Sequence, residues 1–373
     1  MTQTELRPAE PGPAEQITDL LANLSRNAAR ADETGETDPA SIEAVRRSGI
    51  LNASLPTALG GQGQNGSYLR DLLERLGRAD ASIAIIYFQH LLVIDNLIRW
   101  GSEAQKTRYL PKLASGEYLA AAAWSESGAQ RPTVAERHSE GGFTITGIKT
   151  YTTGAGLADL YLLPADVREP DNVVATAPAP TFFLLEREHI HIPQHKGFSL
   201  SGMRGSSTGW IELKGAHVGE DTVFGGIGGA GPIKGNLWRS GQSLGSVALG
   251  ISRAAFALLK AHVQERNLAG SSAIRVKLTE LDTKIHAIAA FVSAAARGDA
   301  PADELPFLVN EAKIFASETA EYVCREVQQQ IGSISYTRGT EIERLWRDAR
   351  GIALMGPANH LLADMLGNQL AAG

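Results

Sequence analysis

The chain has 373 residues, of which 43% are hydrophobic and 20% charged, and its formal net charge is −6. This length predicts two or three domains in a globular protein. The acidic balance and the absence of lysine and arginine runs argue against a nucleic-acid surface. Residues 1–15 are polar and proline-rich, are expected to be disordered, and contain no apolar signal segment. No stretch approaches the ~18–20 apolar residues of a membrane span, so a cytoplasmic protein is expected.

Residues 16–117 predict an N-terminal helical domain, because apolar residues such as Ile17, Leu20 and Leu24 repeat every three or four positions. The segment 82–98 is apolar on nearly every face, which is typical of a buried central helix. It carries His90. A histidine in such a helix is most often a hydrogen-bonded core residue, and a position facing a ligand cavity is the second interpretation.

Residues 118–232 change to an apolar period of two in short runs without intervening helices. This pattern predicts an antiparallel β-domain. Tyr151 and Thr153 lie two positions apart in the run 143–153, so they are expected on one face of a strand.

Two patterns in this region point to sites that we do not expect to exist. The glycines of residues 226–231 match Gly-x-Gly-x-x-Gly, but they lack the strand and helix of a dinucleotide-binding unit and predict a flexible connector. His189 and His191 have no third ligand at a suitable spacing, so no metal site is predicted.

Residues 233–373 return to a helical pattern. Helices are expected at residues 240–267, 274–297, 305–330 and 341–369, which together resemble a four-helix bundle. The predicted fold is therefore α+β, with an N-terminal helical domain, a middle antiparallel β-domain and a C-terminal four-helix bundle.

This order of segments resembles the acyl-CoA dehydrogenase superfamily of flavoproteins, from about residue 16 to residue 369. Five local stretches carry the resemblance: AAAWSESGAQ (121–130), GIKTYTTGA (147–155), GFSLSGMRGSSTGWIELKGAHV (197–218), ALGISRAAF continuing to QERN (248–267), and QQQIGS continuing to ERLWRDAR (328–350). Single stretches are weak signals, but five in the right order are a strong one.

The resemblance implies a bound flavin, FAD rather than FMN. Trp124 and Ser125 match residues that flank the flavin ring in this family. Tyr151 and Thr153 match a second such segment, and they offer an aromatic wall and a hydroxyl group to the ring.

The nucleotide part of the cofactor is matched farther along the chain. Arg266 matches an arginine that reaches the diphosphate across a subunit interface, a role that suits its fork of donors. Gln329 and Gly332 match a segment where the backbone passes close to the nucleotide. The resemblance therefore also implies a homo-oligomer, a dimer or a tetramer.

The catalytic base of the family is missing where we expect it. A dehydrogenase needs a general base for the proton α to the thioester, normally a glutamate. The position that most often carries it, shortly after Arg-Asp-x-Arg, falls on Met355. A second known position falls at residues 240–241, which are not acidic. Ordinary α,β-dehydrogenation is therefore disfavoured.

Monooxygenases of the same fold use a flavin hydroperoxide formed with O2, and they need a water-poor cavity rather than such a base. In some of them a histidine that matches His90 lies near the flavin. A second histidine of these enzymes matches Met355 and is therefore absent from this chain, where His360, one helical turn beyond, would substitute for it. The favoured prediction is oxygenation of a small organic or CoA-thioester substrate. The flavin electrons would come from a flavin reductase or an electron-transfer flavoprotein.

Two alternatives stay open. The first is an acyl-CoA dehydrogenase with a relocated base such as Glu126 or His90. Arg239, in a segment weakly similar to one beside the family's acyl-CoA thioester, would then bind the substrate. The second is a non-catalytic family member that binds a ligand.

Overall fold

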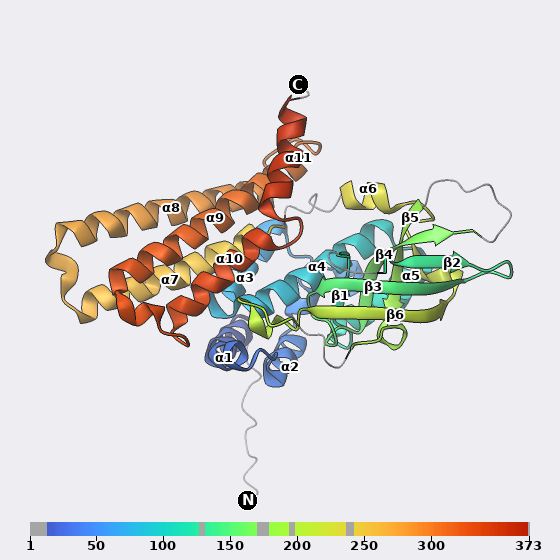
Figure 1. Cartoon of the computed structure of the whole chain (residues 1–373), viewed down its shortest axis with the longest axis horizontal. Coiled ribbons are helices and arrows are strands. Elements are labelled where there is room, and N and C mark those ends of the chain that lie inside the picture. Colours follow the sequence, from blue (N-terminus) through green and yellow to red (C-terminus); the bar gives the residue numbers. More distant parts are fainter. Residues whose placement is uncertain (1–12, 127–130, 170–178, 194–197, 236–241, 372–373) are drawn as a thin grey trace, which may run out of the picture.

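The computed structural model describes residues 13–126, 131–169, 179–193, 198–235 and 242–371. A helical bundle and a β-sheet lie at opposite ends of the molecule, with the N-terminal helices between and beneath them (Figure 1). The predicted α+β order of helices, sheet and helices is confirmed. Arg239 and residues 240–241 fall outside the described residues.

Five helices form the N-terminal part. They are α1 (Pro13–Thr34), α2 (Pro39–Arg47), α3 (Gly66–Ala79), α4 (Ala81–Trp100) and α5 (Glu103–Ser115). Helices α2, α3 and α4 begin after asparagine or aspartate side chains that accept hydrogen bonds from the first backbone N–H groups. Asp80 caps α4 in this way, accepting from the backbone N–H groups of Ser82 and Ile83.

Helices α4 and α7 (Gly245–Glu265) are long and apolar enough to cross a membrane, so the expectation that no stretch approaches a membrane span was wrong. Buried residues make up 83% of the most apolar window of α4 and 67% of that of α7. Both are therefore core helices of this fold, whose apolar residues contact other protein segments.

The described residues in the middle of the chain form one seven-stranded sheet. Its strands are β1 (Ala120–Ala122), β2 (Val134–Arg137), β3 (Phe143–Thr152), β4 (Leu160–Arg168), β5 (Ala179–Glu186), β6 (Gly209–Val218) and β7 (Val223–Phe224). The strand order is β6-β3-β2-β4-β5-β7, and β1 pairs with β4. Most pairings are antiparallel as predicted, but β4 pairs in parallel with both β1 and β2, so the sheet is mixed.

The C-terminal part contains α6 (Ala230–Gly235), α7, α8 (Ser272–Arg297), α9 (Leu305–Ile331), α10 (Glu341–Leu354) and α11 (Asn359–Ala371). Helix α6 begins inside the predicted connector of residues 226–231. The single helix predicted for residues 341–369 is two helices. Helix α10 ends before Met355, and α11 points away from the bundle (Figure 1).

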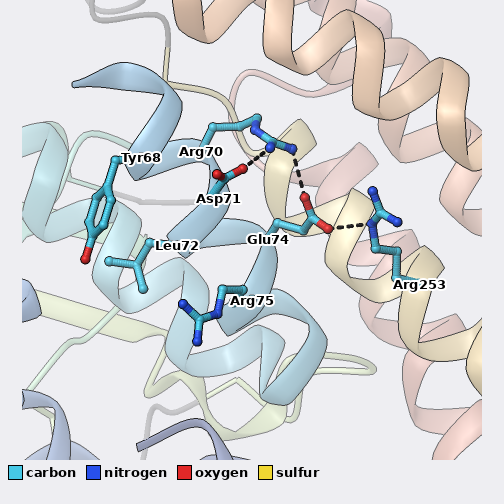
Figure 2. A pocket seen from close by; sticks show the side chains of 7 residues that line it. All are labelled: Tyr68, Arg70, Asp71, Leu72, Glu74, Arg75 and Arg253. Carbon is cyan, nitrogen blue, oxygen red and sulfur yellow. Dashed lines mark hydrogen bonds and ion pairs between the residues drawn. The ribbon is translucent and has the colours of Figure 1, made fainter. Parts of the chain in front are cut away.

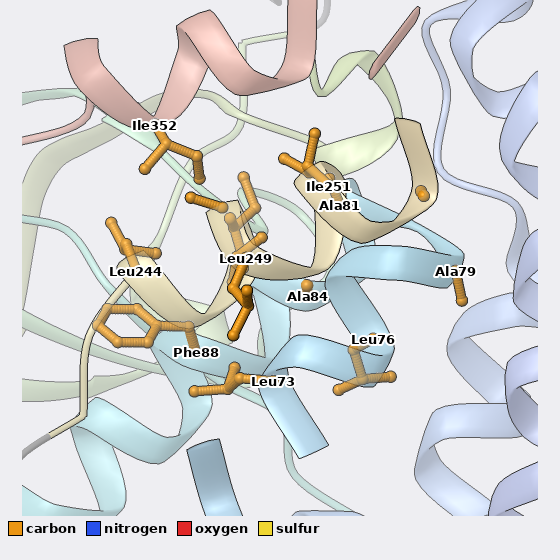
Figure 3. Packing of buried hydrophobic residues seen from close by; sticks show 14 of the residues in the cluster. Leu73, Leu76, Ala79, Ala81, Ala84, Phe88, Leu244, Leu249, Ile251 and Ile352 are labelled. Carbon is orange, nitrogen blue, oxygen red and sulfur yellow. The ribbon is translucent and has the colours of Figure 1, made fainter. Parts of the chain in front are cut away.

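The N-terminal helices and the bundle share one hydrophobic core, which runs from α1 and α4 through α7 to α10. Figure 3 shows this packing, with Leu73 and Phe88 beside Leu249 and Ile352. Gly77 of α3 and Gly250 of α7 allow these two helices to approach closely. A Cβ atom at Gly250 would lie 2.2 Å from the Glu74 carbonyl oxygen.

Candidate functional site

Four of the residues predicted to contact a flavin come together at one end of β3. Ser125 forms a bridge with Thr150, and their hydroxyl oxygens are 3.3 Å apart. Trp124 precedes Ser125, is half-buried, and donates a hydrogen bond from Nε1 to the Leu162 carbonyl oxygen at 3.1 Å. The Trp124–Ser125 segment therefore meets β3 immediately before Tyr151.

The prediction that Tyr151 and Thr153 lie on one strand face was wrong. Tyr151 has a φ of 50°, and the pairing of β3 with β6 shifts register between Lys149 and Thr152. The irregularity breaks the alternation of faces, so the Tyr151 side chain is exposed (52%) while Thr153 is buried (8%). The Tyr151 ring stacks on Phe198 with centroids 4.2 Å apart and planes 2° apart.

Thr153 belongs to a chain of hydroxyl groups. Its Oγ1 lies 3.2 Å from Oγ1 of Thr208, which lies 2.7 Å from Oγ of Ser206. The backbone N–H of Gly154 donates to the Ser206 carbonyl oxygen at 3.1 Å. The end of β3 is thus linked to the segment that precedes β6.

The residues matched to the nucleotide lie elsewhere. Arg266 ends α7, and Gln329 and Gly332 lie at the C-terminal end of α9. Both helix ends are at the end of the bundle farthest from the sheet (Figure 1). Arg266 is exposed and makes no ion pair with the described residues. Gly332 has a φ of +91° and open space where a Cβ would be.

His90 is a core residue. Its ring is fully buried in α4, Nε2 lies 3.1 Å from the Leu51 carbonyl oxygen, and Nδ1 accepts a hydrogen bond from the Ala120 backbone N–H at 3.2 Å. Burial lowers the pKa of His90 to about 4. The neutral ring thus joins α4 to the loop around Leu51 and to β1, and both ring nitrogens are occupied.

The turn that carries Met355 is built around a buried ammonium group. Lys313 of α9 is only 6% exposed. Its Nζ lies 2.8 Å from the Asn359 Oδ1, 3.0 Å from the Pro357 carbonyl oxygen and 3.3 Å from the Met355 carbonyl oxygen. Burial lowers the pKa of Lys313 from 10.5 to about 8.

Lys313 was missed by the sequence predictions, although the sequence carries a signal for it. The residue lies in the apolar stripe of α9, between the buried Val309 and Ala316. A lysine within such a stripe needs acceptors inside the protein. His360, which was predicted to act beside Met355, is instead exposed on α11.

Glu126, the candidate for a relocated base, is paired with Lys149, which is buried to 1% exposure. Glu126 also accepts a hydrogen bond from the Thr133 backbone N–H at 3.1 Å. Burial alone would raise the pKa of Glu126, but the hydrogen bond and charge of Lys149 outweigh it and lower that pKa. A carboxylate held in this way is a poor proton acceptor.

A charged pocket of about 410 Å³ lies between α3 and α7 (Figure 2). Glu74 bridges Arg70, at 2.8 Å, and Arg253, at 2.5 Å. None of the predicted site residues lines this pocket. The described residues also contain no group of three or more histidine, cysteine, aspartate or glutamate side chains suited to a metal ion.

Comparisons with known proteins agree with this architecture. The family models for the acyl-CoA dehydrogenase N-terminal and C-terminal domains match residues 15–117 and 229–370. The probable acyl-CoA dehydrogenase FadE25 of Mycobacterium tuberculosis (strain ATCC 25618 / H37Rv) is 27% identical over 344 residues, which cover 88% of this chain and 86% of that protein.

Two solved structures have the same fold. Butyryl-CoA dehydrogenase from Megasphaera elsdenii aligns with a TM-score of 0.86 at 23% identity, over 98% of this chain and 100% of that one. The FMN-bound dibenzothiophene monooxygenase TdsC from Paenibacillus sp. A11-2 aligns with a TM-score of 0.85 at 20% identity, over 96% of each chain.

The fold and the two matched domains define an enzyme of the flavin oxidoreductase class. The chain belongs to the acyl-CoA dehydrogenase family, as the five sequence stretches predicted. A dehydrogenase and a monooxygenase share this fold, so the fold does not select between the two reactions.

Proposed function

We propose that the protein is a flavin-dependent oxidoreductase that uses O2 to oxygenate a small organic or CoA-thioester substrate. One observation carries the choice of oxygenation. The residue that we align with the family's base position is Met355, and the buried ionisable group that organises its turn is the cation of Lys313. A thioether does not accept a proton, so proton abstraction has no group at this position.

The chain's residues fit a flavin. The stacked ring of Tyr151, the hydroxyl of Thr153 and the half-buried Trp124 and Ser125 offer a flat wall and hydrogen-bonding groups to the isoalloxazine. The exposed guanidinium of Arg266 suits a diphosphate, which favours FAD over FMN. When bound and reduced, the flavin supplies the activation of O2.

The proposed site also depends on a second subunit. The ring-side residues lie at the end of the sheet's strand β3, whereas Arg266, Gln329 and Gly332 lie at the far end of the bundle (Figure 1). We propose that the far end of the bundle in one subunit completes the flavin site of another. A homo-oligomer, a dimer or a tetramer, follows from this arrangement.

In the proposed reaction the two atoms of O2 separate. One enters the substrate and the other leaves as water, with two electrons from the flavin and two protons. A flavin reductase or an electron-transfer flavoprotein would restore the reduced flavin. Met355, which is partly buried against the hydrophobic core, would help to exclude water from the reacting groups.

The second candidate is an acyl-CoA dehydrogenase with a relocated base, which the name of the 27% identical relative favours. The contacts of the proposed bases weigh against it. Glu126 is held by Lys149, and both ring nitrogens of His90 are bonded to the backbone. A third candidate is a non-catalytic ligand-binding member, which would be purified without bound flavin and would not acquire it.

Rapid mixing of the reduced, flavin-loaded protein with O2 tests the proposal. We expect a transient absorbance that differs from both reduced and oxidised flavin and decays faster when substrate is present. The dehydrogenase predicts the opposite behaviour: an acyl-CoA would bleach the oxidised flavin in the absence of O2, and this result would overturn the oxygenase proposal.

Met355→Glu is the matching gain-of-function variant, and Met355→Gln is its uncharged control. If the alignment of the base position is right, the glutamate variant gains flavin reduction by an acyl-CoA that neither the wild type nor the glutamine variant shows. Equal rates for all three proteins would place the base position elsewhere.

A further inference from the structure

The segment from Met203 to Thr208, which precedes β6, has an unusual backbone. Met203 and Ser207 have φ values of 51° and 48°, a backbone conformation that residues other than glycine rarely adopt. A short 3-10 helix joins them. Residues in such conformations persist only when their surroundings hold them in place, and they concentrate at functional sites.

Asp348 of α10 holds the first of these residues. Its Oδ1 accepts a hydrogen bond from the Met203 backbone N–H at 2.5 Å, and the Asp348 side chain is buried. The chain around Met203 lies directly against α10. A Cβ atom at Gly202 would be 2.3 Å from the Arg347 carbonyl oxygen, and the sulfur of Met203 is within 3.6 Å of the position of a Cβ at Gly351.

Neighbouring contacts fix the segment to α1 as well. Arg204 donates from Nε to the Asp32 carbonyl oxygen at 2.5 Å and from Nη1 to the Leu200 carbonyl oxygen at 3.0 Å. Arg347 pairs with the Asp32 carboxylate at 2.6 Å. The segment is thus held on α10 and α1, which belong to opposite ends of the sequence.

The other end of the segment reaches the ring-side residues. Thr208 contacts the hydroxyl of Thr153, and the Ser206 carbonyl oxygen accepts from Gly154. A continuous path therefore runs from the Asp348 carboxylate through the Met203 backbone to Thr153. The path consists of hydrogen bonds and of the covalent backbone of one short segment.

Four charged or titratable groups from four helices interact with Asp348. Arg344 lies on the same helix, with Nη1 3.9 Å from Oδ2 of Asp348. Asp80 at the start of α4, Asp32 of α1 and Cys324 of α9 also interact with it electrostatically. Burial raises the pKa of Asp348 to about 6, against the opposing influence of Arg344 and the Met203 N–H group.

We propose that Asp348 is a positioning residue of the flavin site, which holds the Met203–Thr208 segment so that Thr208 orients the Thr153 hydroxyl toward the flavin ring. The inference rests on the proposed flavin function. It assigns no contact between Asp348 and the cofactor, because Asp348 acts through the backbone of Met203.

Flavin binding by three variants tests the proposal. Asp348→Ala removes the acceptor, Asp348→Asn keeps an oxygen acceptor without charge, and Thr208→Val removes only the hydroxyl beside Thr153. We expect the dissociation constant for FAD, measured by flavin fluorescence, to rise at least tenfold for Asp348→Ala and severalfold for Thr208→Val. Asp348→Asn should stay within about threefold of the wild type at pH 6.

The pH profile separates positioning from a purely structural effect. The Met203 N–H group forms a stronger hydrogen bond with a charged Asp348 carboxylate than with a protonated one. Wild-type FAD affinity should therefore weaken as the pH falls through about 6, where Asp348 gains a proton. Asp348→Asn should remove this part of the profile. Asp282→Asn, on the partly exposed face of α8, is the matched control and should keep it.

A second measurement uses the flavin-free protein. Limited proteolysis should cut Asp348→Ala near Met203 faster than the wild type, while the Thr208→Val pattern stays unchanged. Wild-type FAD affinity in both Asp348→Ala and Thr208→Val would overturn the inference. If Asp348→Ala fails to fold, the pH profile of Asp348→Asn decides, and a profile unchanged from the wild type overturns the inference. Failure of the wild type itself to bind any flavin would overturn the proposed function instead.

Discussion

Replacing His90 tests whether this histidine is a core residue or a catalytic one. His90→Gln keeps a polar side chain that cannot gain a proton. At pH 7 the variant loses at least one of the hydrogen bonds to Leu51 and Ala120, which should lower the free energy of unfolding by about 1–3 kcal/mol.

The pH dependence of the unfolding free energy gives a second, quantitative prediction for His90. His90 has its pKa lowered from 6.5 to about 4 by burial, so the unfolded chain gains a proton before the folded one. The contribution of His90 to stability is complete above pH 6.5 and is lost as the pH falls toward 4. At about 1.4 kcal/mol for each pH unit between 6.5 and 4, the total loss is about 3.5 kcal/mol.

Urea unfolding at a series of pH values measures this loss. The difference in unfolding free energy between the wild type and His90→Gln should shrink by about 2 kcal/mol between pH 6.5 and pH 5. His286→Gln, which removes a histidine from the exposed face of α8, controls for the loss of one histidine. A difference that stays constant over this range would refute the buried, neutral assignment and return His90 to the candidate catalytic residues.

Three further substitutions test the site and the core. Lys313→Met leaves the acceptors of the α10–α11 turn unpaired and should cost about 1–3 kcal/mol of unfolding free energy. Because the pKa of Lys313 is lowered to about 8 in the folded protein, the wild type should gain stability over this variant as the pH rises from 8 to 10.5; a constant difference would contradict the assignment. Glu126→Gln should destabilise the fold by about 1–3 kcal/mol, because Lys149 keeps a buried charge, and adding Lys149→Met should restore much of the loss. If the double variant is no more stable than Glu126→Gln, the pair does not act as described. Gly250→Ala should force α3 and α7 apart and cost about 1–3 kcal/mol by thermal or urea unfolding, whereas an equally stable variant would show that these helices tolerate more separation.

The order of helices, sheet and helices could be predicted from the sequence, because apolar spacing follows the period of each element. The capping asparagine and aspartate side chains of α2 to α4 are equally local features. Family membership followed from five short stretches in order. That residue 355, in the turn after Arg-Asp-x-Arg, is a methionine can also be read from the sequence alone.

The period of two did not predict the environment of Tyr151, because alternation assumes a regular strand. The shift in register between Lys149 and Thr152 separates the exposed Tyr151 from the buried Thr153. Such an irregularity depends on the pairing of β3 with β6, whose residues lie more than 50 positions later in the chain. Sequence spacing within one strand contains no record of that pairing.

The roles of the buried ionisable groups were decided by tertiary structure. The ring of His90 is hydrogen-bonded to the backbone of Leu51 and Ala120. Lys313 is hydrogen-bonded to the turn after α10, and Asp348 to the backbone of Met203. Each of these partners is distant in sequence. The sequence by itself determined which side chains are available for chemistry, and the absence of a base at Met355 stays a prediction from it. Only the packing of distant segments decided which of them stay free to act, because a buried polar group must be bonded wherever the fold places it.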